Sequence, residues 1–147
     1  DERLFVIGTA TLPGMPERSR TSIAKLSALP LILPSGTHGL RALLDAAFKR
    51  AGYVPTIAAE VDGLAMLMDA VRGGLGATIQ PGAALARAEN ASLTSVPLVD
   101  AYATRPNLIA SVSDEELSPA GLAARVVLAD VARHTVNAGR WPGAKLR

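Results

Sequence analysis

Short runs of aliphatic residues alternate along this chain with segments in which apolar residues recur every three or four positions. The runs have the length and composition of buried strands, and the periodic segments predict amphipathic helices. The predicted strands are 4–8, 29–33, 57–61, 76–80, 93–99 and 107–112. The predicted helical segments are 23–28, 40–51, one between Asp62 and Gly73, 83–88 and 119–136.

Strands that alternate with helices of these lengths predict an α/β domain with a mostly parallel sheet and helices on both faces. An isolated strand at the start, and a strand with a long helix at the end, flank a compact βαβαβ block. This order is typical of a two-lobed protein in which the chain leaves one lobe, builds the second and returns.

The composition fits one globular domain and excludes several kinds of chemistry. Of 147 residues, 49% are hydrophobic and only 3% are aromatic, so the core must be aliphatic. Without cysteine there can be no disulfide, thiol nucleophile or thiolate metal site. His38 and His134 lie far apart and lack the spacing of metal ligands. We therefore expect no catalytic residues, no metal and no cofactor.

Charge and apolar run length argue against direct contact with nucleic acid or membrane. The net charge is only +2, and the basic residues are interleaved with acids rather than gathered in one run. The apolar runs are shorter than the roughly 20 residues that cross a bilayer. The start, Asp1-Glu2-Arg3 followed by LFVIG, does not resemble a signal peptide. We expect a cytoplasmic fragment of a longer protein.

Two strand-to-helix junctions carry the candidate binding residues. Ser35, Gly36, Thr37 and His38 follow the strand 29–33 and lead into a helix. Free backbone N–H groups, hydroxyls and the positive end of the helix dipole suit a carboxylate, sulfate or phosphate. Ser35 or Thr37 could instead merely cap the helix, and the residue types leave both interpretations open.

The second junction, Asp62-Gly63-Leu64, has the same ambiguity. Asp62 is a good helix cap, although its carboxylate would repel an anion, while Gly63 would let a ligand approach the backbone. The glycines of GGLGAT at 73–78 follow a helix and precede a strand, which is the reverse of the order in a dinucleotide-binding loop. We interpret them as the residues that end the helix.

Three segments resemble the effector-binding region of LysR-type transcriptional regulators. They are LPLILPSGTHGLRALLDAAF, AEVDGLAMLMDAVRGGLGATIQPGAAL and LIASVSDEELSPAGLAARVVL. The second resembles the family's glutamate-containing helix, glycine-rich turn and strand ending in proline, and the third carries its serine-proline-alanine helix start. LPSGTHGLR further resembles the branch related to nitrogen-assimilation regulators.

The resemblance implies a periplasmic-binding-protein-like fold, present here as one lobe plus the crossover strand and helix of the other. Residues 1–8 would be the first-lobe crossover strand, 9–106 the second lobe, and 107–147 the return strand, first-lobe helix and tail. The DNA-binding helix-turn-helix and most of the first lobe would be absent, so DNA would be bound only through the missing N-terminal domain. The family also implies a homo-oligomer, dimer or tetramer.

The resemblance also implies where a small-molecule effector would bind, in a cleft between the lobes. The matching positions here are Ser35, Gly36, Thr37, His38, Asp62, Gly63, Leu64 and Gln80. Many family members have serine where this chain has Gly63. Ligand binding would favour a closed arrangement of the lobes and so change how the parent protein holds DNA.

Two other functions remain open from the sequence. A solute-binding protein of a transport system shares the two-lobe plan, and a helix-turn-helix upstream would decide against it. An α/β enzyme acting on a carboxylate would need a nucleophile–base pair or a metal set, and the two histidines are poorly placed for either.

Overall fold

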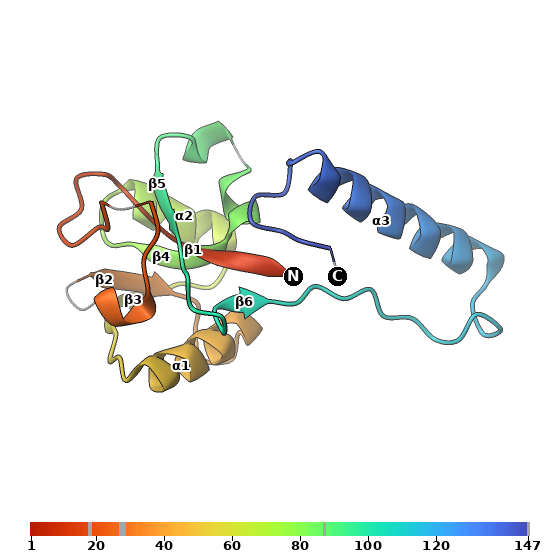
Figure 1. Ribbon diagram of the computed structural model, residues 1–147, viewed down its shortest axis with the longest axis horizontal. Helices are drawn as coiled ribbons and strands as arrows, with labels where there is room; N and C mark the ends of the chain where they lie inside the picture. The colour runs from red at the N-terminus through yellow and green to blue at the C-terminus, as the bar shows by residue number, and fades with distance from the viewer. Residues whose placement is uncertain (18, 27–28, 87, 147) are drawn as a thin grey trace.

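The computed structural model describes residues 1–17, 19–26, 29–86 and 88–146, which form a compact α/β body and one long helix that projects from it (Figure 1). Strand β1 (Glu2–Gly8) lies at the centre of the body. It pairs antiparallel with β4 (Thr78–Pro81) on one side and with β5 (Thr94–Pro97) on the other. The short strand β6 (Thr104–Arg105) pairs antiparallel with the first residues of β1.

A parallel pair of strands adjoins this sheet. Strands β2 (Pro30–Leu33) and β3 (Thr56–Glu60) run parallel, and a parallel bridge between Leu31 and Ala77 connects β2 to the segment that leads into β4. The predicted α/β class is confirmed, but the sheet is mixed rather than mostly parallel. Helical crossovers make β2, β3 and β4 parallel, whereas loops and 3-10 turns connect β1 to β2 and β4 to β5, which allows antiparallel pairing.

Two helices cover opposite faces of the strands. Helix α1 (Gly39–Ala51) and helix α2 (Leu64–Arg72) follow β2 and β3 respectively. Leu31 and Leu33 of β2 belong to the apolar cluster that contains α1, while Ile32 belongs to the cluster that contains α2. Because alternate residues of a strand point to opposite faces, the two clusters are the two sides of one layered core.

The helix ends follow the glycine pattern, and the shorter predicted helices become turns. Gly52 ends α1 in the left-handed conformation, with φ 62°, and Gly73 caps α2, as predicted. The segments predicted to be helical at 23–28 and 83–88 are 3-10 turns, with residues 27, 28 and 87 outside the described part. The turns are η1 (Ile23–Lys25), η2 (Gly82–Leu85) and η3 (Ala88–Asn90).

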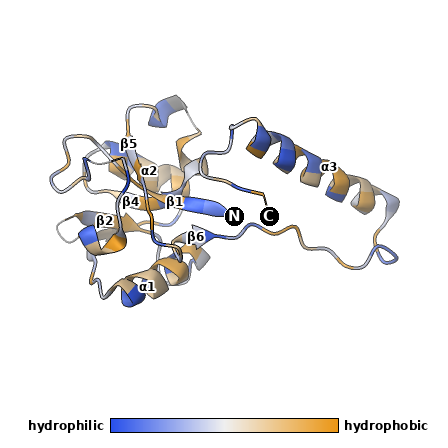
Figure 2. Cartoon of the chain, viewed as in Figure 1, coloured by the Kyte–Doolittle hydropathy of each residue, from blue (hydrophilic) through white to orange (hydrophobic). Residues whose placement is uncertain are grey.

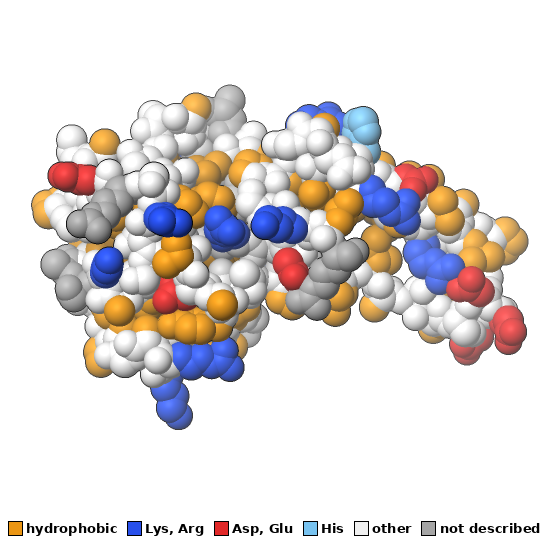
Figure 3. Space-filling view, viewed as in Figure 1, with side chains coloured by type: hydrophobic (Ala, Val, Ile, Leu, Met, Phe, Trp, Pro, Cys, Tyr) orange, Lys and Arg blue, Asp and Glu red, His pale blue; other side chains and the backbone are white. Residues whose placement is uncertain are grey.

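Helix α3 (Pro119–Asn137) begins as predicted but buries none of its residues. Ser118 caps it by accepting the N–H of Gly121 at 3.1 Å, and Pro119 occupies its first turn. Val126, Val127, Leu128 and Val131 are each more than half exposed. Apolar residues therefore lie along the projecting part of the molecule (Figure 2), and apolar side chains are visible on its surface (Figure 3).

The prediction of a strand at 107–112 is wrong. These residues form an exposed connection between the body and α3, in which Leu108 is 85% exposed. A strand requires a partner for its N–H and C=O groups, and within the described residues no strand lies alongside this segment. The pairing occurs two residues earlier, in β6.

The end of the chain returns to its beginning (Figure 1). Ala144 forms an antiparallel bridge with Glu2, and Arg3 donates its backbone N–H to the carbonyl of Gly143 at 3.0 Å. The indole Nε1 of Trp141 donates to the carboxylate of Glu2. We call residues 141–146 the C-terminal segment. Among the described helices, none has the length and apolar character needed to span a bilayer.

Candidate functional site

A cavity of about 210 Å³ opens where β2, β3 and β4 end and where α1 and α2 begin. Buried apolar side chains of Leu40 and Leu67 form part of its wall, and His38, Gln80 and Arg105 bring polar groups to it. Its lining residues are Pro34, His38, Leu40, Val61, Gly63, Leu64, Leu67, Gln80 and Arg105. We call this space the candidate cavity.

Gln80 brings a buried amide to the candidate cavity. The residue lies on β4 and is only 5% exposed. Its Nε2 donates weakly, at 3.4 Å, to the Thr78 hydroxyl, and within the described residues its carboxamide oxygen accepts no hydrogen bond. An amide held in this way can offer both a donor and an acceptor to a molecule in the cavity.

Helix α2 begins at the candidate cavity without a capping side chain. Gly63 is its N-cap, with φ 92° and ψ 112°, a conformation that favours glycine. Glycine has no side chain to accept the first N–H groups of the helix, which begin at Leu64 in the cavity wall, and no other side chain in the described part of the chain accepts them. The positive end of the helix dipole and free donors therefore lie beside the cavity. Asp62 is not the cap that the sequence predicted.

His38 caps α1 and also lines the candidate cavity. Its Nδ1 accepts the backbone N–H of Leu40 at 3.2 Å. Because Nδ1 is the acceptor, the neutral ring carries its proton on Nε2, which can donate to a bound molecule. The alternative that Ser35 or Thr37 caps this helix does not hold, because His38 is the N-cap and the helix begins only at Gly39.

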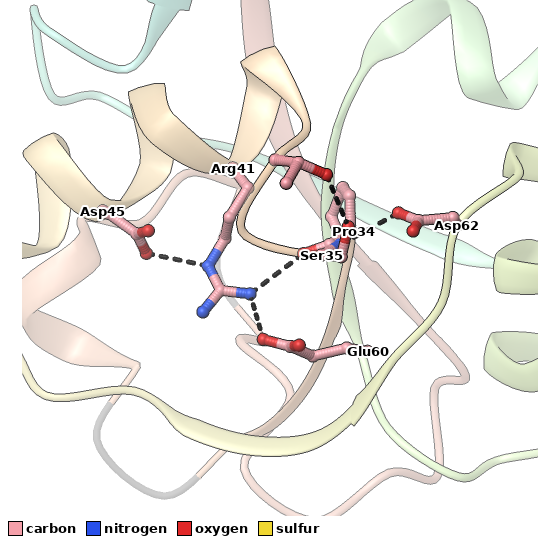
Figure 4. Close-up of polar contacts among 7 residues, drawn as sticks. Pro34, Ser35, Arg41, Asp45, Glu60 and Asp62 are labelled. Atoms are coloured by element: carbon pink, nitrogen blue, oxygen red, sulfur yellow. Dashed lines mark hydrogen bonds and ion pairs between the residues drawn. The ribbon is translucent and has the colours of Figure 1, made fainter.

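A polar network holds the loop that precedes α1 (Figure 4). The guanidinium of Arg41 donates to Glu60 at 2.5 Å, to the carbonyl of Pro34 at 2.9 Å and to Asp45 at 2.9 Å. The hydrogen bonds that Arg41 donates to Glu60 and then to Asp45 raise the pKa of Arg41 above its ordinary value. With only 12% of its side chain exposed, Arg41 fixes the end of β2 against the end of β3.

Asp62 and Ser35 complete this network. Asp62 Oδ1 accepts the backbone N–H of Ser35 at 3.0 Å, and the hydroxyls of Ser35 and Thr37 lie 3.2 Å apart. The hydrogen bonds from Ser35, first its backbone and then its side chain, lower the pKa of Asp62 below its ordinary value. Asp62 therefore ties the two strand-to-helix junctions together instead of capping α2.

The structure brings four of the eight predicted residues into one cavity wall. His38, Gly63, Leu64 and Gln80 line the candidate cavity, whereas Ser35, Gly36, Thr37 and Asp62 are not part of its lining. Arg105 lines it too and was missed, because it lies between the strands predicted at 93–99 and 107–112, where no sequence pattern indicated a site. Within the described residues, no group of three acidic or histidine side chains could hold a metal ion.

Replacing Asp62 by asparagine should destabilise the protein above the ordinary carboxyl pKa of 3.8 and have little effect well below it. A carboxyl group whose pKa is lowered by folding adds stability above its unfolded pKa, and that stability is lost as pH falls through the folded value. Melting temperatures of the wild type and D62N across acidic pH measure this effect. A difference that stays constant down to the lowest pH would contradict the role of the charge.

The chain is similar to one known family in sequence and to a set of solved structures in fold. The family model described as LysR substrate binding domain matches residues 1–134. No curated protein matches the sequence. Among solved structures, the regulatory domain of Synechocystis PCC6803 CcmR in complex with 2-PG has a TM-score of 0.72 at 20% identity, over 88% of this chain and 62% of that one.

Two further solved structures are effector binding domains with a bound small molecule. The effector binding domain of QuiR in complex with shikimate has a TM-score of 0.64 at 21% identity, over 83% of this chain and 57% of that chain. The effector binding domain of BenM with benzoate has a TM-score of 0.58 at 26% identity, over 70% and 47% respectively. The chain thus spans between 47% and 62% of these three domains, and 35% of the LysR family transcriptional regulator CbnR.

Proposed function

We propose, since this chain belongs to the family of LysR substrate binding domains, that it senses a small anionic metabolite and thereby controls DNA binding and transcription by a longer regulator. The family is one of transcriptional regulators. We propose no catalytic activity for this chain. The regulator would act in the cytoplasm as a homo-oligomer, dimer or tetramer, and would bind DNA through a separate N-terminal domain.

The candidate cavity is the observation that carries this proposal. Its polar groups are the imidazole of His38, the buried amide of Gln80, the guanidinium of Arg105 and the uncapped start of α2. These groups favour a negatively charged or hydrogen-bonding molecule, and the side chains of Leu40 and Leu67 favour a small apolar portion. Related domains whose structures contain shikimate and benzoate support the same class.

The eight predicted effector-binding residues take two roles in this proposal. His38, Gly63, Leu64 and Gln80 contact the effector from the cavity wall. Ser35, Gly36, Thr37 and Asp62 shape the loop beside it, and rearrangement of the contact between Ser35 and Asp62 would accompany binding. We further propose residues 9–106 as the second lobe, with 1–8 and 107–147 connecting it to the first.

Filling the candidate cavity should abolish effector binding without unfolding the protein. Leu64 lines the cavity and is 49% exposed, so L64W can place an indole there at little cost to the core. Thermal shift against benzoate, shikimate and sulfate measures binding, because a ligand at a hundredfold excess over its Kd adds about 2.7 kcal/mol of stability. We expect this stabilisation in the wild type and its loss in L64W.

The matched control is M66W on the same helix. Met66 is 67% exposed and does not line the candidate cavity, so this variant should bind as the wild type does. Ligand stabilisation that survives in L64W, or that disappears equally in M66W, would refute the assignment of the cavity. If none of the three probes stabilises the wild type, the proposal of an anion-sensing cavity fails.

A further inference from the structure

Arg105 is the charged residue that lines the candidate cavity, and the described part of the chain provides no partner for its side chain. The other guanidinium near this region, that of Arg41, already makes three hydrogen bonds to Glu60, Pro34 and Asp45. His38 also uses one ring nitrogen to cap α1. Of the side chains around the cavity, Arg105 is therefore the one with a full charge available to a ligand.

The position of Arg105 connects the cavity to the two ends of the chain. On β6 it lies directly opposite Glu2 of β1 in the antiparallel register. Side chains of directly opposed residues lie on the same face of a sheet, with Cβ atoms about 5 Å apart. The two oppositely charged side chains therefore start from neighbouring positions on one face of the sheet.

Glu2 in turn holds the C-terminal segment. It is only 3% exposed, and its carboxylate accepts the indole N–H of Trp141. Glu2 and Trp141 also line a second cavity, of about 170 Å³, together with Ala132 and Val136 of α3. The contact between Glu2 and Trp141 thus lies between the body of the protein and the helix that projects from it.

We propose that Arg105 binds the anionic group of the effector and transmits this binding, through Glu2, to Trp141 and the C-terminal segment. This inference rests on the proposed function and adds to it the residue that recognises the charge and the route by which binding reaches α3. Arg105 and Glu2 carry opposite charges at facing positions of β6 and β1. A bound anion offsets the charge of Arg105, so the carboxylate of Glu2 and its hydrogen bond to Trp141 must readjust.

Removing the charge of Arg105 should weaken anion binding and spare neutral ligands. A hydrogen bond to a charged group contributes more binding free energy than a neutral one, so R105Q should weaken binding of benzoate by about 10- to 100-fold. Titration calorimetry on the 147-residue chain measures this change. Binding of benzamide, which lacks the charge, should change by less than about threefold. The matched control is R3Q, because Arg3 is exposed, lies on the adjoining strand and, one residue from Glu2, points to the opposite face.

The fluorescence of Trp141 tests the transmission separately, because it is the single tryptophan of the chain. Benzoate should change its emission in the wild type and in R3Q. In E2Q the amide oxygen can still accept the indole N–H, so the fold should persist and benzoate should still bind. The emission change on binding should nevertheless be lost, because E2Q removes the negative charge opposite Arg105.

The outcomes separate this inference from the proposed function. If L64W abolishes benzoate binding but R105Q binds as tightly as the wild type, the cavity stands and the role of Arg105 is refuted. If R105Q weakens binding but E2Q keeps the full emission change, the route through Glu2 is refuted. If benzoate, shikimate and sulfate all fail to bind the wild type, the proposed function itself fails, and the inference fails with it.

Discussion

Replacing Leu4 by alanine should lower the free energy of unfolding by about 3 kcal/mol. Leu4 is fully buried in the middle of the sheet, where β1 pairs with β4 on one side and is bonded to the segment after β5 on the other. Truncating the side chain removes apolar contacts and leaves a cavity that strands paired on both sides cannot close. A domain whose total stability is about 5–15 kcal/mol would lose a large share of it.

Chemical denaturation of L4A and of L108A measures this prediction against a matched control. Leu108 is 85% exposed in the connection to α3, so the same substitution there should change the free energy of unfolding by less than about 0.5 kcal/mol. Equal costs at the two positions would contradict the assignment of the core. A cost confined to L108A would mean that the connection packs against something in solution while the sheet does not depend on Leu4.

The local parts of the fold could be predicted from the sequence, and the strand pairing could not. The apolar stripe of α1 and the glycines that end both short helices act within a few residues, so they appear directly in the pattern. The direction of β1 depends on which strands it meets, about 70 to 90 positions later in the chain. Nothing in the aliphatic run at 4–8 distinguishes a parallel from an antiparallel neighbour.

The segment 107–112 also shows that strand pairing cannot be predicted from local sequence. Its apolar composition suits a strand. Among the described residues, however, no strand lies alongside it as a partner. A strand is a property of a pair of segments, so composition alone could not predict that pairing would end at Arg105.

The candidate site was predictable where it depends on the junctions between strands and helices. His38, Gly63, Leu64 and Gln80 lie at such junctions, and the order of elements is enough to place them near one another. The sequence could not show that Asp62 leaves its own helix uncapped. Asp62 instead accepts the backbone N–H of Ser35, which lies 27 positions earlier in the chain. Arg105 reaches the cavity through the pairing of β6 with β1, which no local pattern encodes.

Replacing Gly82 by alanine should detach the C-terminal segment from the body and cost about 2 kcal/mol of stability. A Cβ at this position would collide with the carbonyl oxygen of Pro142 and lie 2.8 Å from the Pro142 carbonyl carbon. Real Cβ atoms do not approach backbone so closely, so the segment must move. Trp141, the neighbour of Pro142, should then lose its hydrogen bond to Glu2, while the core around Leu4 stays intact.

Gly39 provides the matched control, since a Cβ there would meet nothing within 4 Å and its φ is not positive. At the start of α1, G39A should change stability by less than about 1 kcal/mol, in the stabilising direction. Denaturation followed by tryptophan emission distinguishes the variants: G82A should show an exposed indole in the folded protein, whereas G39A should match the wild type. A wild-type emission spectrum in G82A would mean that Pro142 does not lie against Gly82 in solution and that this contact does not hold Trp141 in place.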